Sequence, residues 1–310
     1  MIKKIIITIG LIVIYFFLNY NNGILIEKVT NRLYDFYYMG KFFYYDIRHV
    51  NNKNVILNNK EIKIDENIKI HRLITHGADS IDGNVYTNSL EALNANYSKG
   101  FRMFELDIRK TKDNKYVAVH EWEEWARKTK YKGELPPLYK DFKISKIYQK
   151  YTPLDINDIN NWLSIHKDAI LVTDKVNTPG DFLKFFKYKD RLIMELFSWR
   201  AVNKGLINGI KVMPNWNLIS NMGNNVVSKL SDLNISFVAA DNNIIKENKD
   251  LLKMMMINNI KVYSYGTYKN KSEIKDEKYV ICNESEYFYG VYADNWDFSI
   301  NCNRNKNVTK

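Results

Sequence analysis

The chain has 310 residues, of which 45% are apolar and 26% charged, so its composition fits a globular protein and excludes disorder or a collagen-like fibre. Its 46 basic and 35 acidic residues give a formal net charge of +11, which suits an anionic partner such as a phosphate-rich substrate, a membrane surface or nucleic acid. Two cysteines, Cys282 and Cys302, are too few for a disulfide-dense scaffold or a cysteine-rich zinc site.

The chain opens with an apolar run, IIITIGLIVIYFFL, over residues 5–18, directly after Lys3 and Lys4. This run is shorter than the roughly 20 residues of a membrane span, but Tyr15 and Tyr20 extend it at the interface. Residues 1–22 are therefore predicted to be a single-pass signal anchor. The preceding lysines place the rest of the chain outside the cytoplasm, in the periplasm or at the cell surface. A cleaved signal peptide and a buried core helix are the alternatives, and the lack of small residues at a cleavage site favours the anchor.

Residues 23–67 are predicted to form a membrane-proximal collar and a linker. The aromatic stretch from Glu27 to Tyr45 favours an amphipathic helix, and the polar residues 51–66 favour a linker or an irregular pair of strands. At the other end, residues 301–310 are predicted to be a basic tail. An exported protein allows a disulfide between Cys282 and Cys302, but sequence alone does not show whether the two sulfurs meet.

Residues 68–300 show short apolar runs that alternate with longer amphipathic segments, the pattern of a parallel sheet covered by helices. About eight such units in this length match an irregular (β/α)8 TIM-type barrel. The predicted strands are residues 71–75, 101–108, 116–120, 169–174, 191–197, 210–214, 235–240, 260–265 and 290–294. The predicted helices include residues 89–97, 156–166, 179–186 and 245–257.

Two features make the predicted barrel irregular. Nine strands are predicted for eight places, and the gap from Asp107 to Tyr116 is too short for a crossover helix. The segment from Glu121 to Tyr151 is a long excursion that begins acidic and becomes basic. Because long loops at this end of a barrel shape substrate choice, it is predicted to be a lid or a clamp for anionic head groups, with a solvated loop as the alternative.

Ionisable residues stand at the ends of several predicted strands. His76 and His120 each follow an apolar run, Glu105 and Asp107 share one strand face, and Asp174 ends another strand. In a parallel barrel the carboxyl ends of the strands converge on one mouth. Clustered carboxylates need a compensating cation, and oxygen ligands select Mg²⁺ or Ca²⁺. The sequence therefore predicts a divalent-cation site at Glu105, Asp107 and Asp174, flanked by two histidines that serve as general acid and base.

The ordered motifs THGAD, TNSLEAL, FELDI, VAVHE and LVTDK resemble those of the glycerophosphodiester phosphodiesterases. That family belongs to the phosphatidylinositol-phospholipase-C-like barrel superfamily, which also contains the sphingomyelinase D enzymes. The resemblance covers roughly residues 70–297. It implies a TIM barrel, a Glu-x-Asp metal pair at Glu105 and Asp107, and metal-dependent cleavage of a phosphodiester.

The chain departs from the family pattern at two places. The family's His-Arg-Gly appears as His76-Gly77-Ala78, so the arginine that the family uses on phosphate is absent. Another basic group is expected to replace it, and the candidates are Lys175, Arg109 and Arg127. The family's later Glu-x-Lys aligns with either Thr173 or Asp174 as the ligand, and Asp174 is preferred because its carboxylate still binds a divalent ion.

The predicted function is hydrolysis of glycerophosphodiesters, lysophospholipid head groups or phosphodiester-linked envelope polymers. The alternatives are a sphingomyelinase D-like lyase that forms a cyclic phosphate and a non-catalytic barrel that binds envelope components. Trp122 and Trp296 either line a substrate groove or pack inside the domain. Nucleic acid is not an expected partner, because lysine and arginine are spread along the chain rather than clustered with aromatic residues.

Overall fold

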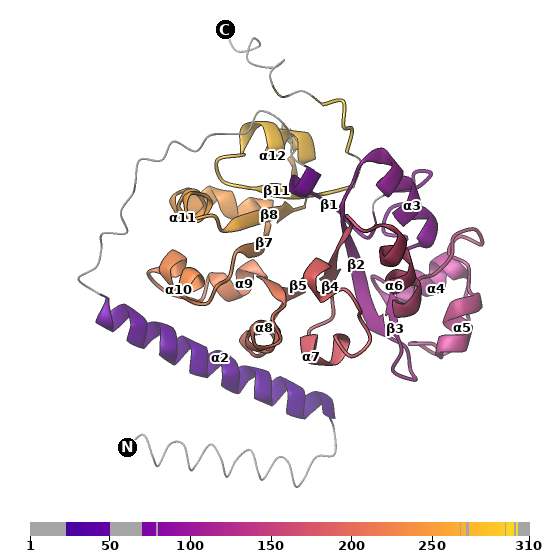
Figure 1. The fold of residues 1–310 in the computed structure, drawn as a ribbon, viewed down its shortest axis with the longest axis horizontal. Coiled ribbons are helices and arrows are strands. Elements are labelled where there is room, and N and C mark those ends of the chain that lie inside the picture. Colours follow the sequence, from indigo (N-terminus) through magenta and orange to yellow (C-terminus); the bar gives the residue numbers. More distant parts are fainter. Residues whose placement is uncertain are drawn as a thin grey trace.

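Eight parallel strands form a closed barrel in the computed structural model, which describes residues 23–49, 70–78, 80–266, 268–270, 273–294, 296–300 and 302 (Figure 1). The strands are β1 (Leu73–Thr75), β2 (Met103–Lys110), β4 (Ile170–Asp174), β5 (Leu192–Leu196), β6 (Lys211–Pro214), β7 (Phe237–Asp241), β8 (Lys261–Tyr265) and β11 (Gly290–Ala293). Their order is β6-β5-β4-β2-β1-β11-β8-β7, and a parallel bridge between Asn215 and Ala239 joins the two ends. The predicted TIM-type barrel is confirmed.

Helices surround this barrel, as in other (β/α)8 folds (Figure 1). They are α3 (Leu90–Lys99), α6 (Ile156–Ile165), α7 (Pro179–Phe182), α8 (Trp199–Ile207), α9 (Trp216–Ile219), α10 (Val226–Asp232), α11 (Ile245–Ile257) and α12 (Glu277–Asn283). Several begin at a side chain that accepts a hydrogen bond from the first turn, such as Ser89 before α3 and Asp155 before α6. On α8, a Cβ at Gly205 would lie 2.5 Å from the Val212 side chain, so glycine allows this helix to pack closely on β6.

One of the nine predicted strands, at residues 116–120, lies outside the barrel path. It is β3 (Tyr116–Ala118), which pairs antiparallel with the extended end of β2. The loop between β2 and β3 is too short for a crossover helix, so the chain turns back as a hairpin. A second hairpin, β9 (Tyr268–Asn270) with β10 (Glu273–Lys275), was not predicted.

The residues after β3 form a small packed layer rather than a solvated loop. Helix α4 (Trp122–Thr129) and helix α5 (Tyr139–Ile144) bury Trp122, Trp125 and Phe142 against β3. The solvated-loop alternative is therefore wrong for this segment. Its use as a lid or clamp remains a prediction.

Alternate positions of the barrel strands fill the interior with apolar side chains. These are Ile74, Met103, Val172, Ile193, Met213, Ala239, Tyr263 and Tyr292. A larger apolar cluster fills the space between the strands and the surrounding helices. The barrel is therefore a packed core, and its polar chemistry is confined to the end where the strands finish.

Helix α2 (Gly23–Arg48) lies across one edge of the barrel, beside α8 and α10 (Figure 1). Tyr38 and Phe42 are buried against Trp199, with ring centroids 5.1 and 5.0 Å from the indole. The aromatic segment that the sequence assigned to an amphipathic helix is thus helical.

Within the described residues, no helix combines the length and the apolar character that a bilayer crossing requires. The predicted anchor at residues 1–22 and the linker at residues 51–66 lie outside the described residues, as does most of the tail at residues 301–310. Cys282 of α12 and Cys302 form a disulfide, with their Cα atoms 5.2 Å apart.

Candidate active site

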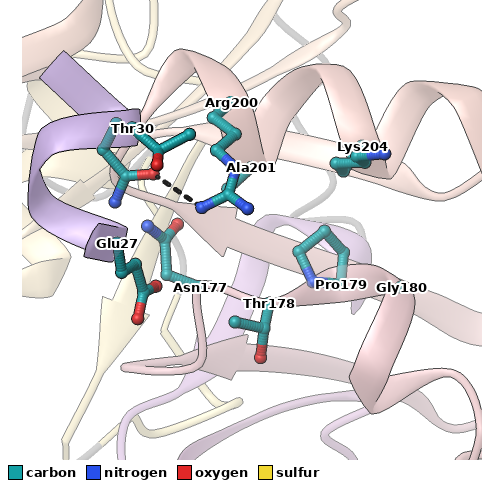
Figure 2. Close-up of a pocket in the computed structure, with 10 residues that line it drawn as sticks. Glu27, Thr30, Asn177, Thr178, Pro179, Gly180, Arg200, Ala201 and Lys204 are labelled. Carbon is teal, nitrogen blue, oxygen red and sulfur yellow. Dashed lines mark hydrogen bonds between the residues drawn. The ribbon is translucent and has the colours of Figure 1, made fainter. Parts of the chain in front are cut away.

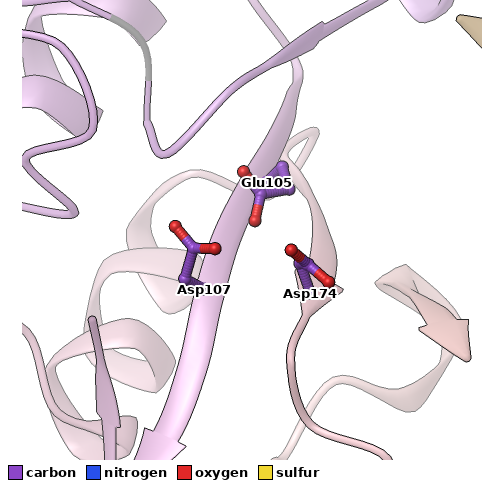
Figure 3. Close-up of side chains that lie close together, drawn as sticks. All are labelled: Glu105, Asp107 and Asp174. Carbon is purple, nitrogen blue, oxygen red and sulfur yellow. The ribbon is translucent and has the colours of Figure 1, made fainter. Parts of the chain in front are cut away.

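Three carboxylates meet at the mouth of the barrel (Figure 3). Strand pairing places Asp107 of β2 directly beside Asp174 of β4, and Glu105 lies two residues before Asp107 on the same face. One oxygen from each carboxylate lies within 4.8 Å of the others. Thr173 occupies the alternate position of β4, so Asp174 is the residue that joins the cluster.

Burial sets the electrostatics of this cluster. It raises the pKa of Glu105 well above its usual value, and the nearby Asp107 and Asp174 carboxylates raise it further. The pKa of Asp107 is raised by burial and then by Asp174. In the described part of the chain, Oε2 of Glu105 accepts a hydrogen bond from the Gly77 amide at 2.6 Å, whereas its buried Oε1 has no hydrogen-bond partner. A buried set of acceptors that is short of donors fits a hard divalent cation.

Two neighbours hold the carboxylates in place. The Asn88 side chain donates to Oδ2 of Asp107 at 2.9 Å and accepts from the Asp107 amide at 3.0 Å. Lys175 has a left-handed backbone, with φ of 65°, and its Nζ lies 2.8 Å from Oδ2 of Asp174 and 3.8 Å from Oδ1 of Asp107. Strand alternation would put Lys175 on the opposite face from Asp174, and the left-handed turn returns its ammonium group to the mouth.

Each histidine of the mouth has a carboxylate at Nδ1. Nδ1 of His76 lies 3.2 Å from Oδ1 of Asp294, which follows β11, and Nδ1 of His120 lies 3.0 Å from Oε2 of Glu124 on α4. Lys128 holds Glu124 through an ion pair of 2.8 Å. At His120 this carboxylate favours the tautomer with the proton on Nδ1 and leaves the Nε2 lone pair for substrate. At His76 the hydrogen bond at Nδ1 is made with the Tyr86 hydroxyl, and among the described residues Oδ1 of Asp294 has no hydrogen-bond partner.

Tyr86 lies between the two imidazoles. Its ring centroid is 4.6 Å from that of His76 and 5.5 Å from that of His120, so the two histidines are separated by one aromatic side chain. The Tyr86 hydroxyl lies 3.1 Å from Nδ1 of His76. A Cβ on Gly77 would lie 2.9 Å from Cα of Tyr86, and Gly77 has a positive φ of 56°. The space that a side chain at position 77 would enter is therefore taken by Tyr86, which needs glycine there.

Among the described residues, a small cavity lies at the mouth and a larger one lies at its rim, away from the carboxylates. A small one of about 10 Å³, lined by Tyr86, His120 and Lys128 among others, has the volume of about one water molecule. A larger one of about 380 Å³, here called the rim cavity, lies between α2, the loop after β4 and α8 (Figure 2). Its lining includes Asn177 and Arg200, and Arg200 donates to Asn31 of α2 at 3.5 Å. We therefore assign the candidate active site from the chemistry of the carboxylate cluster and not from the size of the cavities.

Comparison with known proteins identifies the family. The model of the glycerophosphoryl diester phosphodiesterase family matches residues 80–159, a span that contains Glu105, Asp107 and His120. The predicted resemblance to this family is thereby confirmed over that span. As a glycerophosphodiester phosphodiesterase it is a phosphoric diester hydrolase. A comparison with curated proteins found no match.

Solved structures of the family share the fold. The glycerophosphodiester phosphodiesterase of Thermotoga maritima is 18% identical, with a TM-score of 0.56, and the match covers 72% of this chain and 94% of that one. A putative glycerophosphodiester phosphodiesterase of Galdieria sulphuraria is 13% identical, with a TM-score of 0.56 and coverage of 72% and 93%. A phosphodiesterase of Oleispira antarctica, solved with the product sn-glycerol-3-phosphate, is 14% identical, with a TM-score of 0.54 and coverage of 72% and 92%.

The three basic residues that were predicted to replace the family's arginine occupy different places in this phosphodiesterase. Lys175 lies in the mouth, on the carboxylates. Arg109 donates from Nε to the His120 carbonyl at 2.7 Å and pairs with Glu121, so it supports the chain that carries His120. Arg127 is exposed on α4. Their roles on phosphate remain predictions.

Trp122 and Trp296 are both buried. Trp122 packs against Trp125 and Phe142, and Trp296 belongs to the large cluster between strands and helices. These positions correspond to the packing alternative rather than to the wall of an open groove.

Several residues of the phosphodiesterase mouth were not selected from the sequence. Glu124 had a signal, since it lies four residues after His120 at the start of a helix. Glu195 also had one, because it shares the inward face of β5 with Ile193. It accepts hydrogen bonds from Tyr292 and Asn215, and burial, with a further contribution from Asp174, raises its pKa to about 7.

Tyr86 gave no usable signal. It stands in an irregular loop, and its backbone has a left-handed φ of 53°, which is uncommon for a bulky residue. The Lys128 side chain donates to the carbonyls of Val85 and Tyr86 at 3.2 and 3.1 Å. These contacts between distant segments hold Tyr86 in place, and no local sequence pattern encodes them.

Proposed function

We propose that this phosphodiesterase hydrolyses glycerophosphodiesters with a divalent cation, Mg²⁺ or Ca²⁺, held by Glu105, Asp107 and Asp174, and with His76 and His120 as the acid and base. The observation that carries the proposal is the buried carboxylate cluster, in which Oε1 of Glu105 accepts no hydrogen bond from the described residues. Two imidazoles lie beside this cluster, and each has a carboxylate near Nδ1. Buried carboxylates without a cation are costly, and two oriented imidazoles suit proton transfer.

The metal ion and the protein's own residues have different roles in this reaction. A bound divalent ion polarises the phosphoryl oxygens and offsets the charge of the transition state. One imidazole takes the proton of the attacking water, and the other donates a proton to the leaving alkoxide. Glu124 orients the His120 ring, and the Tyr86 hydroxyl contacts Nδ1 of His76. The carboxylates of Glu124 and Asp294 stabilise the two rings when they are protonated. Lys175 adds a positive charge beside Asp174, where the phosphate's own negative charge arrives.

The substrate class follows from the family and from the bond that is cleaved. The Oleispira antarctica phosphodiesterase was solved with sn-glycerol-3-phosphate, which supports a phosphomonoester of this type as the product here. Lysophospholipid head groups and phosphodiester-linked envelope polymers present the same bond. We also propose that residues 1–22 anchor the enzyme in a membrane with the barrel outside the cytoplasm, a proposal that rests on the apolar run after Lys3 and Lys4.

A substrate panel tests this function. The full chain is incubated with glycerophosphodiesters, lysophospholipids and teichoic-type polymers, with Mg²⁺, with Ca²⁺ and with a chelator, and the products are read by phosphorus NMR. We expect a phosphomonoester that forms only when the metal is present. A cyclic phosphate would instead indicate a lyase, and full activity in chelator would contradict the metal site.

Metal binding is checked separately. Glu105→Gln should abolish calorimetric binding of Mg²⁺ or Ca²⁺, whereas Glu123→Gln, on the exposed side of α4, should leave it unchanged. Equal binding by the two variants would overturn the assignment of the ligands.

A further inference from the structure

Helix α2 has two unlike faces. One face packs on the barrel through Tyr38 and Phe42. The opposite face, here called the aromatic face, consists of large apolar side chains that are at least half exposed. They are Phe36 (69%), Tyr37 (64%), Met39 (50%), Phe43 (67%), Tyr44 (55%) and Ile47 (56%). Phe36, Phe43 and Ile47 follow one another at helical spacing, so the exposed side chains form one continuous stripe. A stripe of this kind marks an interaction surface.

The charges of α2 are divided between these faces. Its acidic residues are engaged on the barrel side: Asp35 accepts from the Trp199 amide at 3.3 Å, Asp46 pairs with Lys229 at 2.8 Å, and Glu27 lines the rim cavity. The basic residues of the helix are exposed, and they are Lys28, Arg32, Lys41 and Arg48. The aromatic face is therefore bordered by positive charge, which complements an anionic surface.

The position of α2 relates this face to the active site. Its barrel side lines the rim cavity together with the loop after β4. It contacts the start of α8 at Trp199 and the start of α10 at Asn225, whose side chain donates to Asp46 at 3.2 Å. All three lie at the carboxyl ends of the strands, where the mouth opens. The helix thus contacts the barrel on the side where the mouth opens, and Figure 1 shows it beside α8 and α10.

We propose that the aromatic face of α2 binds the interfacial region of an anionic lipid bilayer, with the helix in the plane of the membrane and the mouth held beside the lipid surface. Exposed Phe and Tyr side chains flanked by lysine and arginine are the composition of interfacial helices. The apolar run of residues 5–18 precedes the helix closely in sequence, so the chain arrives at Gly23 from a segment of high lipid affinity.

A second copy of the chain fits this face less well. Two copies that met through the same face would oppose their basic borders, because a two-fold contact pairs each surface with itself. The proposal does not depend on hydrolysis, so its failure and that of the proposed function are separable.

Site-directed labelling of the full chain tests the proposal. The two native cysteines are joined in the disulfide, so Phe43→Cys supplies a single reactive thiol for a nitroxide label. On adding vesicles of phosphatidylcholine and phosphatidylglycerol, we expect the ratio of oxygen to nickel-complex accessibility to rise several-fold at this label and at one on Phe36→Cys. Labels on Ile144→Cys and Ile165→Cys, at exposed apolar positions of the barrel, should not change.

The outcomes are distinct. The proposal would be overturned if, with vesicles present, the label at Phe43→Cys stays as accessible to water as the label at Ile165→Cys. Protection of the label before vesicles are added would also overturn it, and sedimentation would then show whether a second copy covers the face. The double variant Lys41→Gln/Arg48→Gln should weaken the response to anionic vesicles. Hydrolysis of a soluble glycerophosphodiester by Phe43→Cys, measured without vesicles, should match that of the unchanged chain.

Discussion

The mouth of the barrel and the aromatic face of α2 depart from the usual distribution of side chains in opposite directions. In the mouth, Glu105, Asp107 and Glu195 are buried although they carry charge or would carry it in water. On α2, Phe36 and Phe43 are two-thirds exposed although they are apolar. Both arrangements cost free energy in the isolated protein, and both lose that cost when a matching partner binds. We propose a small, hard cation as the partner of the first region and a broad lipid surface as the partner of the second.

The largest expected difference between the two regions is in catalysis. His76→Ala and His120→Ala should each lower kcat/KM for a glycerophosphodiester by about 10²–10⁴-fold, because each removes a proposed general acid or base. His49→Ala, at the end of α2, should leave kcat/KM unchanged. Steady-state kinetics measures both, and full activity in the two mouth variants would show that their imidazoles take no part in the reaction.

The next difference concerns the pH dependence of stability. The pKa of Glu195 is raised to about 7 in the folded protein from its usual 4.5, mainly by burial, so the folded state binds this proton more tightly than the unfolded state. The contribution of the Glu195 carboxyl to the free energy of unfolding is fully present below its usual pKa of 4.5, and it is lost as the pH rises through 7. Glu195→Gln should therefore gain stability relative to the unchanged chain between pH 5 and pH 8, by up to about 3 kcal/mol. Urea unfolding in chelator at the two pH values measures the gain, and parallel pH dependences would contradict it.

Two glycine substitutions compare the backbone of the mouth with the backbone of α2. Gly77→Ala should destabilise the protein by about 1–3 kcal/mol, because the new Cβ meets Tyr86 at a left-handed backbone position. Gly40→Ala on α2 should stabilise it by about 0.5–1 kcal/mol, since nothing lies within 4 Å of that Cβ and alanine favours the helix. Denaturant unfolding of both variants gives the two values, and effects of the same sign would argue against the tight fit of Tyr86 over Gly77.

The smallest expected effect is on the aromatic face itself. Phe43→Ser should change the free energy of unfolding by no more than about 0.5 kcal/mol, because the side chain is exposed and touches little of the barrel. Its neighbour Phe42 is buried against Trp199, so Phe42→Ala should cost about 3–5 kcal/mol. A large loss of stability in Phe43→Ser would mean that the protein itself covers this face, and the lipid proposal would then fail.

Much of the barrel could be predicted because its signal is local. Alternating strands and helices give the fold, and the gap from Asp107 to Tyr116 correctly marked the place where the chain forms a hairpin instead of a crossover. The carboxylates at positions 105, 107 and 174 could be placed together because strand ends converge in any parallel barrel. These inferences need the strand period and the topology, but no knowledge of side-chain packing.

The parts that could not be predicted depend on backbone geometry that tertiary contacts impose. Strand alternation placed Lys175 on the far face, yet a left-handed φ brings it back to Asp174. Tyr86 adopts a similar left-handed conformation and fills the space above Gly77. Asp294 reaches His76 only because β1 and β11, at opposite ends of the domain sequence, are neighbours in the sheet.

The disulfide between Cys282 and Cys302 encloses Asp294 in a covalent ring with a sequence separation of 20 residues. Just before this ring, Glu277 at the start of α12 accepts a hydrogen bond from the Asp294 amide at 2.7 Å, so the helix that carries one cysteine also holds the backbone at Asp294. Closing a loop of this size removes disorder from the unfolded chain worth about 3 kcal/mol. The cross-link thereby limits the freedom of a carboxylate that lies 3.2 Å from His76. We therefore expect reduction of the two distant sulfurs to loosen the surroundings of an imidazole in the mouth.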